Sequence, residues 1–431
     1  MRGRDARDAA CAGVGVVRAA IHPSAEKGAI VNRFISILLL CLVLAGLTAG
    51  FALAGELEEC TTAVITGQAT ADGSPILWKN RDTDSLSNKI VLVREKPYDY
   101  LAAVNAAETS GRIVWGGLNS AGFAIINSVA YNLPQESGEA RDLEGHVMAD
   151  ALRSCATADD FENYLKANLG PGLGVQTNFC VIDANGGAAI FETHNHGYKR
   201  LEASETTRKY LLNTNFSRSG KADKGAGYLR YDRENELFRA VPAGKLTHDF
   251  VLQTAARDLG STLLHHPDRA EWKQLPADRP AWIHANYTID RGATACAMVI
   301  HGVKQGEDPR NATLWVILGE PVCSIAIPLW VAAGETPAEL RAGGRAPIYQ
   351  ESLRLQERLR PLKGRDRVEY LDLSKLDNRA GTGWLPGNLE LERGIIQEAA
   401  RLLERGATSA QLAAFEQAAA ARALAALQRI P

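Results

Sequence analysis

The sequence lacks the features that mark several large classes of protein. Lys and Arg total 48 against 50 Asp and Glu, so there is no basic surplus of the kind that nucleic-acid-binding proteins carry. A net charge of −2 with 46% hydrophobic residues also excludes a disordered acidic chain. Only 6% of residues are aromatic while 39 are glycine, which is typical of sheet-rich domains with many tight turns. We expect a folded protein of one or two domains with no nucleic-acid partner.

Several catalytic and metal-binding motifs are also missing. There is no G-x-S-x-G elbow, which argues against a serine α/β-hydrolase, and no H-E-x-x-H metal motif. The pairs His194–His196 and His265–His266 have no carboxylate or cysteine at a spacing that completes a ligand set. We interpret them as exposed loop histidines and expect neither a metal ion nor a cofactor. No internal repeats occur.

One long apolar run lies near the N-terminus. Residues 34–54 are apolar, follow the basic Lys27 and Arg33, and end in the small-x-small sequence Ala52-Leu53-Ala54. This pattern predicts a signal peptide over residues 1–54, cleaved after Ala54, and hence a periplasmic or secreted protein. An uncleaved membrane anchor is the alternative, since the run is long enough to span a bilayer, although its glycines disfavour that role. We expect no stable membrane anchor after cleavage.

The cysteines become informative once that leader is removed. Seven cysteines are too few for a disulfide scaffold. Five follow the leader, at positions 60, 155, 180, 296 and 323. An odd number in an exported protein indicates a reactive thiol, and the other four could form up to two disulfides. The sequence does not assign their pairing.

The apolar patterns predict mixed helices and strands. Strand-like runs occur in residues 60–130, 177–216 and 295–331, with a hairpin turn at Asp72-Gly73. Helical patterns cover residues 142–168, 227–240 and 247–264, with Thr157 as a helix N-cap. Blocks of hairpins separated by blocks of helices indicate an α+β fold.

The composition changes near Glu335. Residues 389–429 are rich in Ala, Leu, Glu and Arg and predict two amphipathic helices with a turn at Gly406. We therefore expect a main domain over 60–334 and a mostly helical C-terminal extension over 335–431. The extension contains no catalytic motif, and it would pack on the main domain or on a second subunit, so a homo-oligomer stays open.

Cys60 combines two features that suit nucleophilic catalysis. It opens the first predicted strand a few residues after the predicted cleavage site, and the hairpin brings 79–82 back beside it. If Cys60 became the N-terminal residue, its α-amine, with a pKa of about 8, could accept the thiol proton. A nearby carboxylate would orient the amine, and nearby cations would lower the pKa of the thiol.

The residues from Cys60 onward resemble a known family. The stretch CTTAVITGQATADGSPILWKNRDTD is similar to the start of the cysteine N-terminal-nucleophile (Ntn) hydrolases, which include penicillin acyltransferases, choloylglycine hydrolases and acid-ceramidase-like amidases. Later segments follow the family's order over about residues 60–330: GGLNSAGF from Gly116, FCVIDANG from Phe179 and LNTNF from Leu212. The resemblance implies a four-layer αββα sandwich.

The resemblance also implies roles for individual residues. Cys60 would be the nucleophile with its own α-amine as base, and Asp82 would hold that amine. Asn127 and Asn215 match asparagines of the oxyanion hole, and Arg291 matches a second active-site arginine. Lys79 stands where the family usually has arginine, and Arg81 could supply the guanidinium instead, although the two cations differ in geometry.

These roles lead to a hypothesis about function. The chain would be an exported amidohydrolase that cleaves the C–N bond of a small N-acyl amide through an acyl-thioester. Removal of a short propeptide, residues 55–59, would expose Cys60 and activate it. An acyltransferase or a dipeptidase of the same fold is an alternative. A non-catalytic exported binding protein is another, supported by the departure at Lys79.

Overall fold

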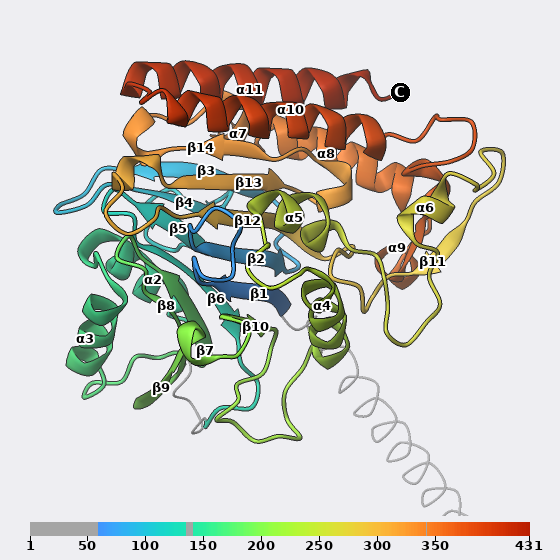
Figure 1. Cartoon of the computed structure of the whole chain (residues 1–431). Helices are drawn as coiled ribbons and strands as arrows, with labels where there is room; N and C mark the ends of the chain where they lie inside the picture. The colour runs from blue at the N-terminus through green and yellow to red at the C-terminus, as the bar shows by residue number, and fades with distance from the viewer. Residues whose placement is uncertain (1–58, 135–140, 342) are drawn as a thin grey trace, which may run out of the picture. The chain divides into compact units, whose positions relative to one another are not determined.

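Two antiparallel sheets form the centre of the structure, a computed structural model that describes residues 59–134, 141–341 and 343–431 (Figure 1). The first sheet has the strand order β10-β1-β2-β12-β13-β14, and the second follows the chain from β3 to β9. Strands β11 and β15 form a separate two-stranded sheet. The predicted signal peptide, and the predicted propeptide apart from Glu59, lie outside the described residues.

The strands and helices have the following bounds. The first sheet contains β1 (Glu59–Ile65), β2 (Ile76–Asp82), β10 (Tyr210–Asn213), β12 (Thr294–His301), β13 (Thr313–Leu318) and β14 (Ile327–Leu329). The second contains β3 (Asn88–Val93), β4 (Tyr100–Asn105), β5 (Gly116–Asn119), β6 (Ala124–Val129), β7 (Thr177–Ile182), β8 (Ala188–His194) and β9 (Gly197–Glu202). The small sheet is β11 (Trp282–His284) with β15 (Tyr370–Asp372). The described helices are α2 (Glu144–Ser154), α3 (Ala158–Asn168), α4 (Tyr228–Ala240), α5 (His248–Gln253), α6 (Arg269–Trp272), α7 (Ala338–Arg341), α8 (Pro347–Leu359), α9 (Arg365–Glu369), α10 (Leu385–Glu404) and α11 (Ser409–Arg429).

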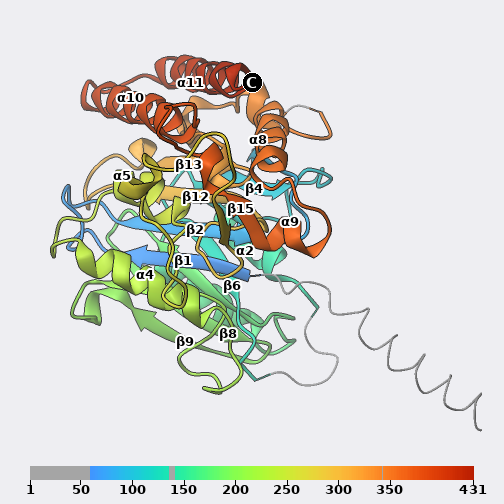
Figure 2. The same ribbon diagram turned by 90° about the vertical axis from the view of Figure 1, so that its right-hand side faces the viewer.

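The two large sheets pack face to face, because β1 and β2 contact β6 and β7. Helices cover both outer faces (Figure 2). Helix α2 packs on β5 and β6, whereas α4, α5, α8 and α10 pack on strands of the first sheet. The layers therefore run helix, sheet, sheet, helix, and the predicted αββα sandwich is confirmed. Strand β2 is buried along its whole length, as expected for a strand covered on both faces.

The predicted turn and cap signals are found in the structure. Asp72 accepts a hydrogen bond from the Ser74 amide in the β1–β2 hairpin, and Gly73 has a φ of 84° there. Thr157 caps α3 in a capping box with Asp160. Residues 247–264 are less helical than predicted, since α5 ends at Gln253.

Helices α10 and α11 are the pair predicted from the C-terminal composition, and Gly406 adopts a φ of 69° between them. Their apolar faces join the same hydrophobic core as β1 and β2. A buried ion pair also attaches α10 to the rest of the chain, since Arg257 Nη2 lies 2.7 Å from Glu392 Oε2. None of the described helices combines the length and the apolar composition needed to cross a membrane.

The suggested disulfides are not present. Cys155, Cys180, Cys296 and Cys323 are buried thiols that form no disulfide. They lie, in chain order, at the end of α2, in strand β7, in strand β12 and in a 3₁₀ turn at Pro321–Cys323. The expectation of up to two bridges is therefore wrong, and these thiols serve as small apolar core residues.

Glu416 should make stability depend on pH. This buried side chain of α11 accepts a hydrogen bond from the Trp330 amide, and burial raises its pKa from 4.5 to about 9. The unfolded chain releases this proton near pH 4.5, whereas the folded chain keeps it until about pH 9. The free energy of unfolding should therefore fall as pH rises between these values. We expect Glu416→Gln to remove that fall. The free energy of unfolding of the variant, relative to that of the wild type, should therefore be more than about 1 kcal/mol higher at pH 8 than at pH 5.

The measurement is urea-induced unfolding at both pH values. Glu398→Gln is the matched control on α10, because Glu398 is 45% exposed and pairs with Arg422 at the surface. The control should change stability equally at both pH values. If Glu416→Gln also changed the free energy of unfolding equally at both pH values, Glu416 would be ionised in the folded protein.

Candidate active site

The pairing of β1 with β2 sorts the motif residues onto two faces of the sheet. Cys60 lies opposite Arg81, and Glu59 lies opposite Asp82. Since successive side chains of a strand point to opposite faces, Cys60 and Arg81 share one face with Lys79, and Glu59 and Asp82 share the other. The stretch 79–82 therefore contributes to two different environments.

The face with Cys60 points toward the second sheet. Lys79 Nζ donates to the Trp115 carbonyl at 2.9 Å and to Asn127 Oδ1 at 2.7 Å. The Arg81 guanidinium lies 4.2 Å from the centre of the Trp115 ring, and Arg81 Nη1 donates to Asn88 Oδ1. Cys60 is 5% exposed. The predicted nucleophile thus shares a buried face with two cations, a setting that favours a thiolate.

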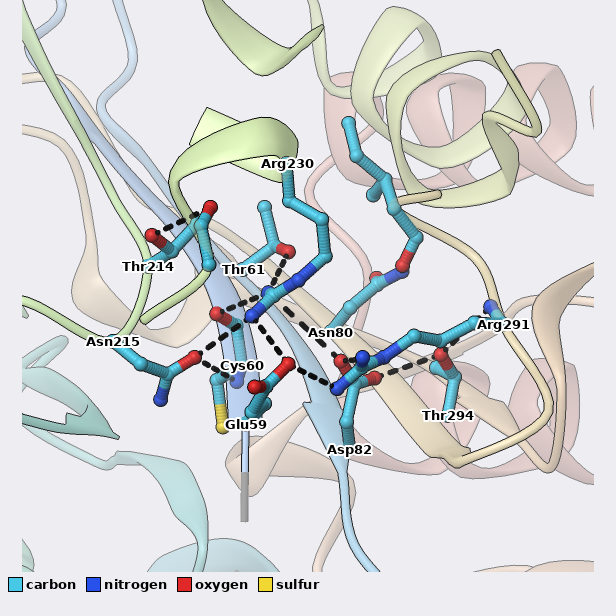
Figure 3. A network of polar contacts seen from close by, with 12 residues as sticks. Glu59, Cys60, Thr61, Asn80, Asp82, Thr214, Asn215, Arg230, Arg291 and Thr294 are labelled. Atoms are coloured by element: carbon cyan, nitrogen blue, oxygen red, sulfur yellow. Dashed lines mark hydrogen bonds and ion pairs between the residues drawn. The ribbon is translucent and has the colours of Figure 1, made fainter. Parts of the chain in front are cut away.

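The opposite face carries a buried ionic cluster (Figure 3). One oxygen of Glu59, Oε2, lies 2.9 Å from Arg230 Nη2 and 2.6 Å from Arg291 Nη2. Arg291 Nε also donates to Asp82 Oδ2 at 2.8 Å, and the Thr294 hydroxyl donates to Asp82 Oδ1 at 2.7 Å. Two carboxylates and two guanidinium groups therefore balance each other beside the start of β1.

The backbone of Cys60 is held on both sides of its Cα. Its amide N–H donates to Asn215 Oδ1 at 2.9 Å, and its carbonyl accepts from Arg230 Nη1 at 2.7 Å. Arg230 Nη2 donates to the same Asn215 oxygen, and Asn215 Nδ2 donates to the Val129 carbonyl. Asn215 and Arg230 thus hold the Glu59–Cys60 peptide, and they would also lie beside the α-amine if Cys60 became the N-terminal residue.

These contacts change the part expected of Asn215. The resemblance assigned it to the oxyanion hole, which needs a hydrogen-bond donor. The structure instead aims its oxygen, an acceptor, at the Cys60 nitrogen, and its amide nitrogen is used by Val129. This geometry suits a residue that positions the α-amine.

Asn127 lies on β6 of the second sheet, and Lys79 connects it to the face of the first sheet that carries Cys60. Its oxygen accepts from Lys79, and its Nδ2 donates to Thr177 Oγ1 at 3.2 Å. That last hydrogen bond is long, and Nδ2 is the donor Asn127 could turn toward a developing oxyanion. Lys79 thus fixes the orientation of the Asn127 amide, while Arg81 is held by Asn88 and Trp115. Both cations contact Trp115, Lys79 through the backbone carbonyl and Arg81 through the ring.

Arg230 is the residue that the sequence analysis missed. It lies on α4, is 2% exposed, and contacts Glu59, Cys60, Thr61 and Asn215. Its helix was predicted, but hydropathy treats arginine as a surface residue and gave no sign that this one is buried. The available signal was spacing, since the buried positions of α4 are Arg230, Glu234 and Phe238.

The electrostatics of the cluster follow from burial and pairing. Burial alone would raise the pKa of Glu59, but Arg291 and Arg230 hold that pKa below its ordinary value. Burial lowers the pKa of Arg230, and the neighbouring Arg291 lowers it further. Burial raises the pKa of two thiols near this region, Cys180 to about 12 and Cys296 to about 11. Those two cysteines therefore stay protonated near neutral pH.

One group among the described residues has the composition of a metal site. Ligand atoms of Asp72, His248 and His301 all lie within 4.8 Å of one another. His301 pairs with Ile76, the first residue of β2, whereas Asp82 is the last residue of that strand. Roughly 20 Å of strand therefore separates this group from the ionic cluster. An ion held there would not reach Cys60, and the chemistry around Cys60 requires none.

No protein-family model and no curated protein matches the chain. Among solved structures, the ortholog of N-acylethanolamine-hydrolyzing acid amidase from Caenorhabditis elegans is 14% identical, with a TM-score of 0.33 over 43% of this chain and 80% of that one. Conjugated bile acid hydrolase from Clostridium perfringens (variant R18L) is 11% identical, with a TM-score of 0.35 over 60% and 89%. Penicillin V acylase from Agrobacterium tumefaciens is 12% identical, with a TM-score of 0.32 over 63% and 86%.

These proteins belong to the classes that the sequence resemblance named. The similarities are weak, however, and the fold is defined by the two sheets and four layers described above. What each of these enzymes hydrolyses is a property of that enzyme.

Loss of Arg230 should destabilise the unprocessed chain. Arg230→Met would leave the partly buried Glu59 carboxylate and the Cys60 carbonyl without this partner, and breaking a buried ion pair costs about 3 kcal/mol. We expect that loss in the free energy of urea-induced unfolding, measured in a Cys60→Ala background so that only the unprocessed chain is compared.

Arg239→Met is the control on the same helix, because Arg239 is exposed. It should change stability by less than about 0.5 kcal/mol. Equal effects of the two substitutions would contradict a structural role for the buried ionic cluster.

Proposed function

We propose that this chain is an exported cysteine Ntn amidohydrolase that acts on a small N-acyl amide after Cys60 becomes its N-terminus. The observation that carries the proposal is the environment of the Glu59–Cys60 peptide. Its nitrogen is bound by Asn215, and the Glu59 side chain is clamped by Arg230 and Arg291. Most peptide bonds inside a strand have only backbone partners, so this set of side chains supports a special role for this bond.

The proposed activation is an attack of Cys60 on its own preceding peptide bond. Sγ adds to the Glu59 carbonyl carbon, the C–N bond breaks, and the nitrogen takes a proton to become the free α-amine. Water then hydrolyses the resulting thioester and releases the propeptide. The chain has no free amine at Cys60 before this step, so the unprocessed protein should lack amidase activity.

Turnover would repeat the same chemistry on an external amide. The α-amine, held by Asn215, accepts the thiol proton, and Sγ forms an acyl-thioester while the leaving amine takes that proton. Asn127, which hydrogen-bonds to Lys79, would stabilise the tetrahedral oxyanion. A donor of this kind contributes about 3 kcal/mol to lowering the barrier. Lys79 and Arg81 would favour the thiolate electrostatically.

Two alternative activities would use the same site. An acyltransferase would resolve the thioester with an amine instead of water, and a dipeptidase would accept a peptide as the N-acyl amide. Export rests on the leader predicted over residues 1–54, which would place the protein in the periplasm or outside the cell.

A non-catalytic exported binding protein is the competing proposal. Lys79 supports it, because the family usually has arginine at this position. The satisfied hydrogen bonds of Lys79 to Trp115 and Asn127 argue against decay of the site. The two proposals differ on whether Cys60 reaches the N-terminus.

We expect the purified exported protein to begin at Cys60 and Cys60→Ala to retain Glu59. Intact-mass analysis and N-terminal sequencing measure both. The reason is that Ala has no sulfur to attack the preceding carbonyl. Amidase activity toward a panel of N-acyl amides should be lost in the same variant.

Cys155→Ala provides the matched control, since Cys155 is another buried thiol but lies at the end of α2 on the second sheet. It should be processed and active like the wild type. A wild-type chain that keeps Glu59 and hydrolyses none of the amides would rule out the enzyme and leave the binding protein.

A further inference from the structure

Glu59 is placed as if it were part of a substrate. Its carbonyl is the one that Cys60 would attack, and its side-chain carboxylate is bound between Arg230 and Arg291 at 2.9 Å and 2.6 Å. A glutamyl residue joined through its carbonyl is a five-carbon acyl group with a carboxylate at the far end. Its position therefore marks both the scissile carbonyl and a place for a distal anion.

Departure of Glu59 leaves the cluster with unequal charges. Arg230 and Arg291 are 2% and 8% exposed, and Asp82 is the one carboxylate among the described residues that would still contact them. The new α-amine adds no negative charge. Buried guanidinium groups without counter-charges are costly, so the processed site has a strong requirement for an anion.

Glu234 does not meet that requirement. It lies one turn after Arg230 on α4 and is completely buried, and neither carboxyl oxygen has a hydrogen-bond partner among the described residues. Burial raises the pKa of Glu234 well above its ordinary value, which keeps it protonated and neutral. In the part of the chain that the structure describes, Glu59 and Asp82 are the carboxylates that pair with Arg230 and Arg291, so an external anion would replace Glu59.

We propose that the processed protein prefers acyl groups that carry a carboxylate where Glu59 carried its own, namely glutaryl-type amides. Arg230 and Arg291 would bind the distal carboxylate while Cys60 attacks the proximal carbonyl. This inference rests on the proposed function and names the substrate class of that site.

The chemistry of the two thioesters supports this substrate class. Self-processing passes through a glutamyl group on Cys60 Sγ, and cleavage of a glutaryl amide passes through a glutaryl group on the same atom. The two differ in the peptide nitrogen on the α-carbon, which the glutaryl group lacks. In the second case Sγ forms the C–S bond, the amide C–N bond breaks, the leaving amine takes the thiol proton, and water completes hydrolysis. A site that holds the first acyl group holds the second.

The anion site can be tested without any processing. Glu59→Ala in the Cys60→Ala background removes a CH₂–carboxylate fragment, which acetate replaces. Acetate should raise the thermal unfolding midpoint of this double variant in a saturable way, whereas neutral acetamide should not. Neither compound should shift Cys60→Ala alone, because Glu59 still fills the site. Equal shifts by acetate and acetamide, or no shift by either, would overturn the inference.

The substrate class is tested with the processed protein. The probes are aminomethylcoumarin amides of glutaryl, 4-carbamoylbutanoyl and pentanoyl groups, which share a chain length but differ in the terminal group. We expect kcat/KM for the glutaryl amide to exceed the other two by at least tenfold. Glu234→Gln is the control variant and should keep this ratio, because it replaces a neutral carboxyl group with a neutral amide.

The outcomes separate the inference from the function on which it rests. Hydrolysis of all three amides at similar rates, dependent on Cys60, would leave the amidase intact and overturn the glutaryl preference. An uncleaved Glu59–Cys60 bond would overturn both, because the carboxylate of Glu59 would still occupy the site. A ratio close to one in the wild type that rises in Glu234→Gln would show that Glu234, and not an external anion, neutralises Arg230, and would overturn the inference.

Discussion

The balance of charges at the start of β1 is the constraint on which this structure depends. Arg230 and Arg291 are buried beside Glu59 and Asp82, and buried charges are tolerated only when they are paired and hydrogen-bonded. The cluster joins residues from three distant segments of the chain: β1 with β2, helix α4, and the loop before β12. One member, Glu59, belongs to the segment that the proposed activation removes. The same contacts that complete the fold of the unprocessed chain would therefore define what the processed site must bind.

Strand alternation explains how a short motif serves two purposes. Lys79 and Arg81 face the second sheet together with Cys60, while Asp82 faces the ionic cluster. Cys60 thus lies in a buried cationic environment on one side of the sheet, and the groups that hold its backbone lie on the other. The two sheets fix the first environment, and helix α4 fixes the second. A four-layer sandwich supplies both because the first sheet is covered on each face.

The sequence was sufficient for the architecture, and the features that it did not predict have physical causes. The hairpin at Asp72-Gly73 and the cap at Thr157 were predictable because local hydrogen bonds determine them. Arg230 was missed because its burial depends on tertiary partners. The orientation of Asn215 could not be predicted for a related reason: a motif identifies an amide, but only its neighbours decide whether the oxygen or the nitrogen faces the cysteine.

The central claim is that the Cys60 thiol, at the start of the processed chain, carries the acyl group during turnover. The most direct measurement is rapid acid quenching of the protein with an N-acyl amide in excess, followed by peptide mass mapping. The account predicts an added acyl mass, removable by hydroxylamine, on the peptide that begins with Cys60. Turnover with an acyl adduct on another residue, or on a peptide that still contains Glu59, would contradict it.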